Sequence, residues 1–99
     1  MHKLILQNCN LINDVSALGH VHTLDLNGCK LVKNVSALGH VHTLDLSKTT
    51  VSDVSALGTV HTLALNYCSN VIDISALGDV SDLSICNCRN ILDASALKM

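Results

Sequence analysis

The sequence contains no phenylalanine, no tryptophan and no proline, and Tyr67 is its only Phe, Trp or Tyr residue. A core without large aromatic side chains has to be built from many similar aliphatic contacts, and leucine, isoleucine and valine account for 33 of the 99 residues. With 48% of its residues apolar and 14% charged, the chain is expected to fold as one domain over residues 1–99.

Charge of either sign is also scarce. Glutamate is absent, so the eight acidic residues are all aspartate, and they outnumber the six lysines and arginines to give a net charge of −2. Proteins that bind nucleic acid through its phosphates usually carry a basic surplus, so this sequence predicts no nucleic acid partner.

Long apolar runs are missing as well. None approaches the roughly 20 residues that span a bilayer, and the stretch Leu4-Ile5-Leu6 is too short for the core of a signal peptide. We therefore expect no membrane association and no secretion. The five cysteines are an odd number, which favours reduced thiols in the cytoplasm or another intracellular reducing compartment.

What the sequence does contain is an internal repeat. The tripeptide Ser-Ala-Leu occurs five times, at intervals of 20, 19, 20 and 20 residues, which divides the chain into units 1–20, 21–40, 41–59, 60–79 and 80–99. Apolar residues at the fourth and sixth positions of each unit, with mostly polar residues between them, have the two-residue period of a half-buried strand. Such short units cannot hold both a strand and a long helix, so consecutive strands are expected to stack in parallel as a solenoid.

Each unit also carries the signals of a tight turn. A short polar side chain that can cap a single helical or 3₁₀ turn stands two residues before every Ser-Ala-Leu. These residues are Asp14, Asn34, Asp53, Asp73 and Asp93. A glycine that we expect to close the turn with a positive φ follows the leucine in the first four units, at Gly19, Gly39, Gly58 and Gly78.

The segment Val21-His22-Thr23-Leu24-Asp25-Leu26-Asn27-Gly28-Cys29 resembles the LxxLxLxxN/CxL phrase of leucine-rich repeats, and the resemblance extends through all five units. The Asp-Val-Ser-Ala-Leu half is similar to the short variable segment of internalin-type repeats, whereas the cysteine at the ninth position resembles the cysteine-containing subfamily. The sequence is also similar to small leucine-rich repeat proteins of amoebal giant viruses and protists, which leaves a viral origin and a virion location open.

The resemblance implies a fold of the α/β repeat class: a right-handed solenoid with a five-stranded parallel β-sheet and short turns or 3₁₀ segments on its convex side. It also implies a non-enzymatic module that binds a protein or peptide. Repetition itself argues against an enzyme, since an active site needs distinct groups at one place and residues 15–26 and 35–46 are identical. The sequence has no phosphate-binding loop, nucleophile motif or catalytic dyad, and no cofactor is expected.

The third, fifth and seventh positions of the units should form the concave surface. Asp25 and Asp45 are expected to be neighbours on adjacent strands, where like charges destabilise the sheet unless Lys48 or a cationic partner offsets them. Tyr67 is an aromatic anchor near a strand end. The residues predicted to contact a partner are Thr23, Asp25, Asn27, Thr43, Asp45, Ser47, Thr62, Asn66 and Tyr67. The alternative is a solvated sheet surface with ordinary polar ladders.

A second hypothesis is a passive structural or scaffold element that assembles end to end. The sequence shows no polar capping unit, so the end units should expose aliphatic residues and an unpaired strand edge. We expect a homo-oligomer formed through Leu4, Ile5, Leu6, Ile72 and Leu92. The alternative is a monomer whose end units fray.

The histidines follow the repeat in two columns, with His2, His22, His42 and His61 in one and His20 and His40 two residues earlier. Side chains two residues apart in an extended segment point to the same side. A third hypothesis is therefore a two-by-two grid that binds Zn²⁺, Ni²⁺ or Cu²⁺ through His20, His22, His40 and His42. The alternative is a solvated ladder. In either case protonation near pH 6 should cost stability, because adjacent like charges repel.

The ninth position of the units holds Cys9, Cys29, Cys68 and Cys88, with Thr49 in the third unit. Their spacing matches no zinc signature, and ligands strung along a solenoid do not converge on one point. In leucine-rich repeats this position points inward, so the resemblance implies a buried ladder of structural thiols. Cys86, at a seventh position, is expected to be exposed and to be the most reactive thiol.

Overall fold

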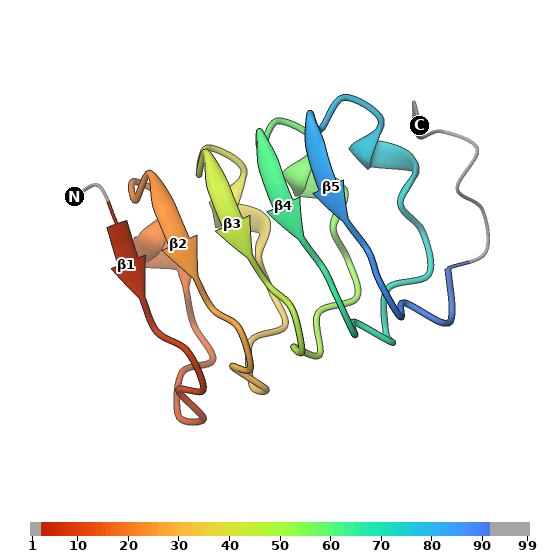
Figure 1. Ribbon diagram of the computed structural model, residues 1–99. Coiled ribbons are helices and arrows are strands. Elements are labelled where there is room, and N and C mark those ends of the chain that lie inside the picture. The colour runs from red at the N-terminus through yellow and green to blue at the C-terminus, as the bar shows by residue number, and fades with distance from the viewer. Residues whose placement is uncertain (1–2, 92–99) are drawn as a thin grey trace.

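The computed structural model describes residues 3–91 as successive coils of one solenoid (Figure 1). Each coil contributes one short strand: β1 (Lys3–Ile5), β2 (Thr23–Asp25), β3 (Thr43–Asp45), β4 (Thr62–Ala64) and β5 (Asp82–Ser84). All neighbouring pairs are parallel, and the sheet order is β1-β2-β3-β4-β5. The strands pair in register, so the fourth residue of one unit lies beside the fourth residue of the next unit, as Leu24 does beside Leu44. The predicted parallel leucine-rich repeat architecture is confirmed.

Four 3₁₀ turns lie on the side opposite the sheet (Figure 1): η1 (Ser16–Leu18), η2 (Ser36–Leu38), η3 (Ser55–Leu57) and η4 (Ser75–Leu77). The predicted polar residue precedes each turn, and its Oδ1 accepts a hydrogen bond from the backbone N–H of the first turn residue. The bond is 3.0 Å from Ser16 to Asp14 and 2.9 Å from Ser75 to Asp73. The predicted caps are confirmed in four units, and Asp93 lies outside the described residues. No helix within residues 3–91 is long and apolar enough to cross a membrane.

The glycines that end these turns do not have the positive φ predicted for them. Their φ lies between −66° and −60° at Gly19, Gly39, Gly58 and Gly78. Glycine is needed for a different reason, because a Cβ on Gly19 would lie 2.5 Å from the carbonyl oxygen of Ala37 in the next coil. Successive turns therefore approach so closely that no side chain fits between them.

Positive φ occurs instead at the eighth position of every unit. The residues there, with φ between 59° and 79°, are Asn8, Gly28, Lys48, Tyr67 and Asn87. Glycine and asparagine adopt this left-handed conformation more readily than lysine or tyrosine do. The chain therefore turns out of the sheet in the same way whatever residue occupies this position, and Lys48 and Tyr67 hold a backbone conformation that is uncommon for their type.

The core is a stack of aliphatic side chains between the sheet and the 3₁₀ turns. Its central leucines are at most 1% exposed: Leu24, Leu26, Leu44, Leu46, Leu63 and Leu65. In the first and fifth units the equivalent residues, such as Leu4 and Leu83, are only partly buried against this core. The leucines at the fourth and sixth positions are therefore fully buried in the three central coils.

The cysteines at the ninth position join the coils from inside. The Sγ of Cys29 donates a hydrogen bond of 2.9 Å to the backbone oxygen of Leu6, and that of Cys68 donates one of 3.0 Å to Leu46. Burial raises the pKa of both thiols, which keeps them protonated as donors. Thr49 takes the same position in the third unit and donates to Leu46 at 2.7 Å within its own coil. The predicted inward ladder of thiols is confirmed.

Candidate functional site

The concave face of the sheet presents two columns of polar side chains. Thr23, Thr43 and Thr62 lie side by side at the third position, and Asp25 and Asp45 are paired at the fifth. All five residues are partly buried. The predicted adjacency of the two aspartates is therefore confirmed, because in-register parallel pairing brings equivalent positions of successive units together.

The two carboxylates differ in how their oxygens are used. Asp25 accepts a hydrogen bond at Oδ1 from the backbone N–H of Asn27 at 3.0 Å and one at Oδ2 from Nε2 of Gln7 at 2.7 Å. Asp45 accepts one at Oδ1 from the backbone N–H of Ser47 at 2.9 Å, and its Oδ2 has no hydrogen-bond partner within residues 3–91. Asp45 therefore keeps an acceptor for a donor from outside the chain.

Apolar side chains border this acidic pair in the same column. Ile5 on β1 lies beside Asp25, and Ala64 on β4 lies beside Asp45. Ile5 is 53% exposed. The surface thus combines two carboxylates with aliphatic flanks, which suits a side chain that has an apolar stem and a cationic head.

Lys48 does not offset the acidic pair, contrary to one of the two possibilities raised by the sequence. Its Nζ lies 5.7 Å from the centroid of the Tyr67 ring, in a cation–π arrangement. Both residues occupy the eighth position, where the chain leaves the sheet, and Tyr67 is 55% exposed. Tyr67 is therefore accessible at the edge of the concave surface, and Lys48 lies over its ring rather than beside Asp25 and Asp45.

The seventh position contributes less surface than predicted. Ser47 is only 3% exposed, so it is not available to a partner, and its Oγ accepts a hydrogen bond from the backbone N–H of Asn66 at 3.1 Å. Oδ1 of Asn66 in turn accepts bonds from the Oγ of Ser84 at 2.7 Å and the backbone N–H of Cys86 at 2.8 Å. These short side chains bond the backbone and side chains of the next coil. Asn27 and Asn66 are partly buried, and Cys86 is exposed as predicted.

Three histidine rings form a stack where the strands begin. The ring centroids of His22 and His42 lie 4.6 Å apart with an angle of 11° between the planes, and those of His42 and His61 lie 4.5 Å apart at 10°. Nδ1 of each ring is hydrogen-bonded to Oγ1 of the following threonine, at 2.9 to 3.0 Å. His20 and His40 lie exposed in the preceding turns.

This arrangement does not assemble the predicted metal-binding grid. Imidazole nitrogens bind zinc at about 2.0–2.1 Å and must converge on one point, whereas parallel stacked rings place their nitrogens side by side. Within residues 3–91 no three side chains of His, Cys, Asp or Glu are placed so that they could hold a metal ion. His20, His22, His40 and His42 therefore form no shared ligand set. The rings of His22 and His42 instead belong to a stack that continues to His61.

The residues predicted to mediate self-association do not form one patch. Leu4 and Leu6 are partly buried and belong to the exposed end of the core, whereas Ile5 points to the concave side. Ile72 is 49% exposed and lines a hollow on the convex side. Leu92 lies outside the described residues.

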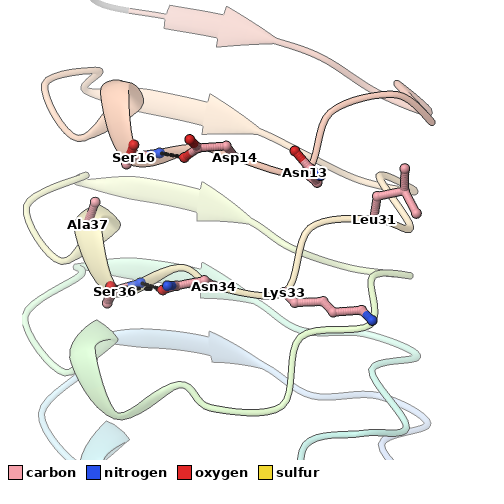
Figure 2. Close-up of a pocket in the computed structure, with 8 residues that line it drawn as sticks. All are labelled: Asn13, Asp14, Ser16, Leu31, Lys33, Asn34, Ser36 and Ala37. Carbon is pink, nitrogen blue, oxygen red and sulfur yellow. Dashed lines mark hydrogen bonds between the residues drawn. The ribbon is translucent and has the colours of Figure 1, made fainter.

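A hollow on the convex side was not predicted from the sequence. It has a volume of about 690 Å³ and lies between the first two coils, where Figure 2 shows Asn13, Asp14, Ser16, Leu31, Lys33, Asn34, Ser36 and Ala37. Asp14 and Asn34 are occupied there by their bonds to the serine N–H groups. In the sequence this hollow is marked only by the residue just before each cap, which differs from unit to unit. It is Asn13 in the first unit and Lys33 in the second.

Short parallel strands, 3₁₀ turns on the opposite side and inward thiols define an internalin-type leucine-rich repeat fold. Internalin InlF from Listeria monocytogenes matches 97% of this chain at 22% identity, with a TM-score of 0.76. The functional domain of InlJ from the same organism, which includes a cysteine ladder, matches 97% at 18% identity, with a TM-score of 0.51. The present chain spans about a third of their lengths, 31% and 32% respectively. No protein-family model and no curated protein matches the sequence.

Proposed function

We propose that the chain is a non-enzymatic protein-interaction module that binds a protein or peptide through its concave surface. The observation that carries this proposal is the pair Asp25 and Asp45, which no lysine or arginine offsets within residues 3–91 and which retains a free carboxylate oxygen. Solenoids commonly bind through extended concave surfaces of this kind. The contact residues are Thr23, Asp25, Thr43, Asp45 and Thr62, with Tyr67 at the edge.

The chemistry of this surface favours a partner that presents a basic side chain. An arginine or lysine would bring the positive charge that the paired carboxylates lack, in a charge-assisted hydrogen bond to Oδ2 of Asp45. Ile5 and Ala64 would contact its aliphatic stem. All five cysteines are free thiols, which supports a reducing intracellular compartment as the place of action.

Capture of partners from a lysate tests this proposal when wild type is compared with two double variants. Asp25→Asn with Asp45→Asn removes the concave charges while keeping an Oδ1 acceptor on each side chain. Asp14→Asn with Asp53→Asn removes the same charge on the convex side, where Asn34 already occupies the column. We expect wild type and the convex variant to capture the same proteins and the concave variant to lose them. Equal capture by all three would contradict the proposal.

The alternative function is a scaffold that assembles end to end, and one observation favours it. β1 is one of the two outer strands of the described sheet, and the core residues Leu4 and Leu6 beneath it are only partly buried. A second copy stacked on this edge would bury them. Light scattering at micromolar concentrations would then give at least a dimer mass for wild type and a monomer mass for Leu4→Lys, whereas a monomer mass for wild type would exclude assembly.

A further inference from the structure

The histidine ladder, which we define as His22, His42 and His61, is tied to the sheet through its backbone. The N–H groups of His42 and Thr43 both donate to the carbonyl oxygen of His22 at 3.0 Å, and those of His61 and Thr62 donate to that of His42 at 3.1 and 3.0 Å. These bonds fix the distance between successive coils. The rings therefore cannot separate by sliding the coils apart, but only by rotating their side chains.

Rotation of a ladder ring has a structural consequence. Each Nδ1 bonds the hydroxyl of the next residue, at 2.9 Å for both His42 with Thr43 and His61 with Thr62. A ring that leaves the stack breaks this bond and frees a hydroxyl that belongs to the third-position column of the sheet. The stack and the threonine column are thus ordered together.

Protonation of neighbouring rings would disfavour the stack. Parallel imidazoles at centroid distances of 4.6 and 4.5 Å form favourable face-to-face contacts when uncharged. Imidazolium rings in the same places would bring positive charges into direct opposition, and like charges that face each other on adjacent strands destabilise a sheet. Histidine is the side chain whose charge changes between pH 5 and 8.

The other charged groups around the ladder do not remove this conflict. The elements beside it carry Lys3 and Asp82 in the threonine column, Asp25 and Asp45 three residues after His22 and His42, and His20, His40 and Asp79 in the turns before the strands. The charges that help to lower the pKa of the middle ring, His42, after the effect of desolvation, are those of His61 and His22. Proton uptake therefore places like charges on both sides of the central ring.

We propose that the histidine ladder is a pH-sensitive device, in which proton uptake drives the stacked rings apart, releases the threonine hydroxyls and destabilises the solenoid. The geometry needs no partner, so this proposal stands or falls independently of the concave binding surface. The histidine ladder would then act as a proton sensor, on a surface where residues 3–91 form no metal site.

The direction of the pH dependence follows from linkage. Desolvation, and then the charges of His61 and His22, lower the pKa of His42 in the folded protein. An unfolded histidine keeps its ordinary pKa, so between the two values the unfolded state binds more protons and stability falls as the pH falls. The loss begins near the ordinary histidine pKa of about 6.5, and above that pH the ladder costs nothing.

Urea unfolding of wild type and two double variants between pH 8 and pH 5 tests this device. His22→Gln with His42→Gln leaves a single ladder ring, whereas His20→Gln with His40→Gln removes the same number of histidines outside the ladder. We expect the urea midpoint of wild type and of the control variant to fall as the pH is lowered, and that of the ladder variant to change much less. Equal slopes for the two variants would overturn the proposal.

Histidine ring signals in NMR spectra give a second readout that needs no variant. We expect the His42 ring to titrate below the ordinary range for histidine, and the hydroxyl-bearing threonine Thr43 to shift with the same midpoint. A His42 titration at an ordinary pKa, or a Thr43 signal that ignores it, would contradict the coupling. Far-UV circular dichroism at pH 8 shows whether the variants in the unfolding experiment keep the fold.

Discussion

The thiol of Cys29 donates a hydrogen bond of 2.9 Å to the backbone carbonyl of Leu6 in the preceding coil. One small side chain thereby fills the interior and ties two coils together at the point where the first leaves the sheet. Cys68 forms the same kind of bond to Leu46, so the ninth position carries a recurring link between neighbouring units. The ladder of thiols is part of the core and does not contribute to the concave face.

Replacing Cys29 by alanine is expected to lower the free energy of unfolding by about 1–2 kcal/mol, because a buried sulfur atom and its hydrogen bond are both lost. Cys29→Thr should cost less, since Thr49 already fills this position in the third unit with a hydroxyl that donates to a backbone carbonyl. Urea denaturation of the two variants measures the difference. An alanine variant as stable as wild type would show that the ladder has no structural role.

Thiol labelling should separate the cysteines by position. Cys86 is exposed, whereas Cys29 and Cys68 are fully buried and burial raises the pKa of both thiols. With a small alkylating reagent at pH 8 and mass spectrometry of the digested protein, we expect Cys86 to be modified first and the buried pair to react only after unfolding. Labelling of Cys68 at the rate of Cys86 would mean that the coils open readily.

Removing a glycine at the end of a 3₁₀ turn should lower stability, whereas introducing a glycine at the eighth position of a unit should not. Gly39→Ala is expected to destabilise the protein by about 1–3 kcal/mol, because the new Cβ would lie 2.7 Å from the carbonyl oxygen of Ala56. Lys48→Gly should instead leave stability unchanged or raise it by up to about 1 kcal/mol, because Lys48 has a φ of 61°. Thermal unfolding of both variants tests this pair. A tolerated alanine at position 39 would show that the turns do not pack as closely as described.

Stability should also fall at acidic pH through the turn caps. Hydrogen bonds from the Oγ and N–H of Ser55 lower the pKa of Asp53 below its usual value of 3.8. A carboxylate of this kind stabilises the fold above its unfolded pKa, and this contribution is lost as the pH falls through the folded value. We expect Asp53→Asn, which keeps an acceptor, to reduce the loss of stability below about pH 4. An unchanged acid transition would argue against the cap.

Much of the fold follows from the sequence because it depends on local or periodic features. The 20-residue interval dictates in-register parallel strands, and the caps at Asp14 and its equivalents span only two residues. The conformation of the eighth position could not be predicted, since asparagine, glycine, lysine and tyrosine share no property that requires a positive φ. The crowding at Gly19 is set by the approach of one coil to the next, which the sequence does not show either.

The sequence predicts which residues share a column of the candidate surface, but not how their side chains are buried or oriented. Register alone places Asp25 beside Asp45. The burial of Ser47 depends on its bond to an N–H of the next coil, and the position of Lys48 depends on the rotamer that brings it over Tyr67. The orientation of the histidine rings likewise depends on the threonine that follows each of them. Such choices are made by side-chain rotamers, which a repeat pattern does not specify.

Mapping of the contact surface by NMR, with a captured partner titrated into the isotope-labelled chain, tests the proposed function most directly. We expect the largest chemical-shift changes on β2 to β4 at the threonine and aspartate columns, and we expect Asp45→Asn to weaken them. Changes confined to the 3₁₀ turns, or a partner that binds the Asp45→Asn variant as tightly as wild type, would contradict it.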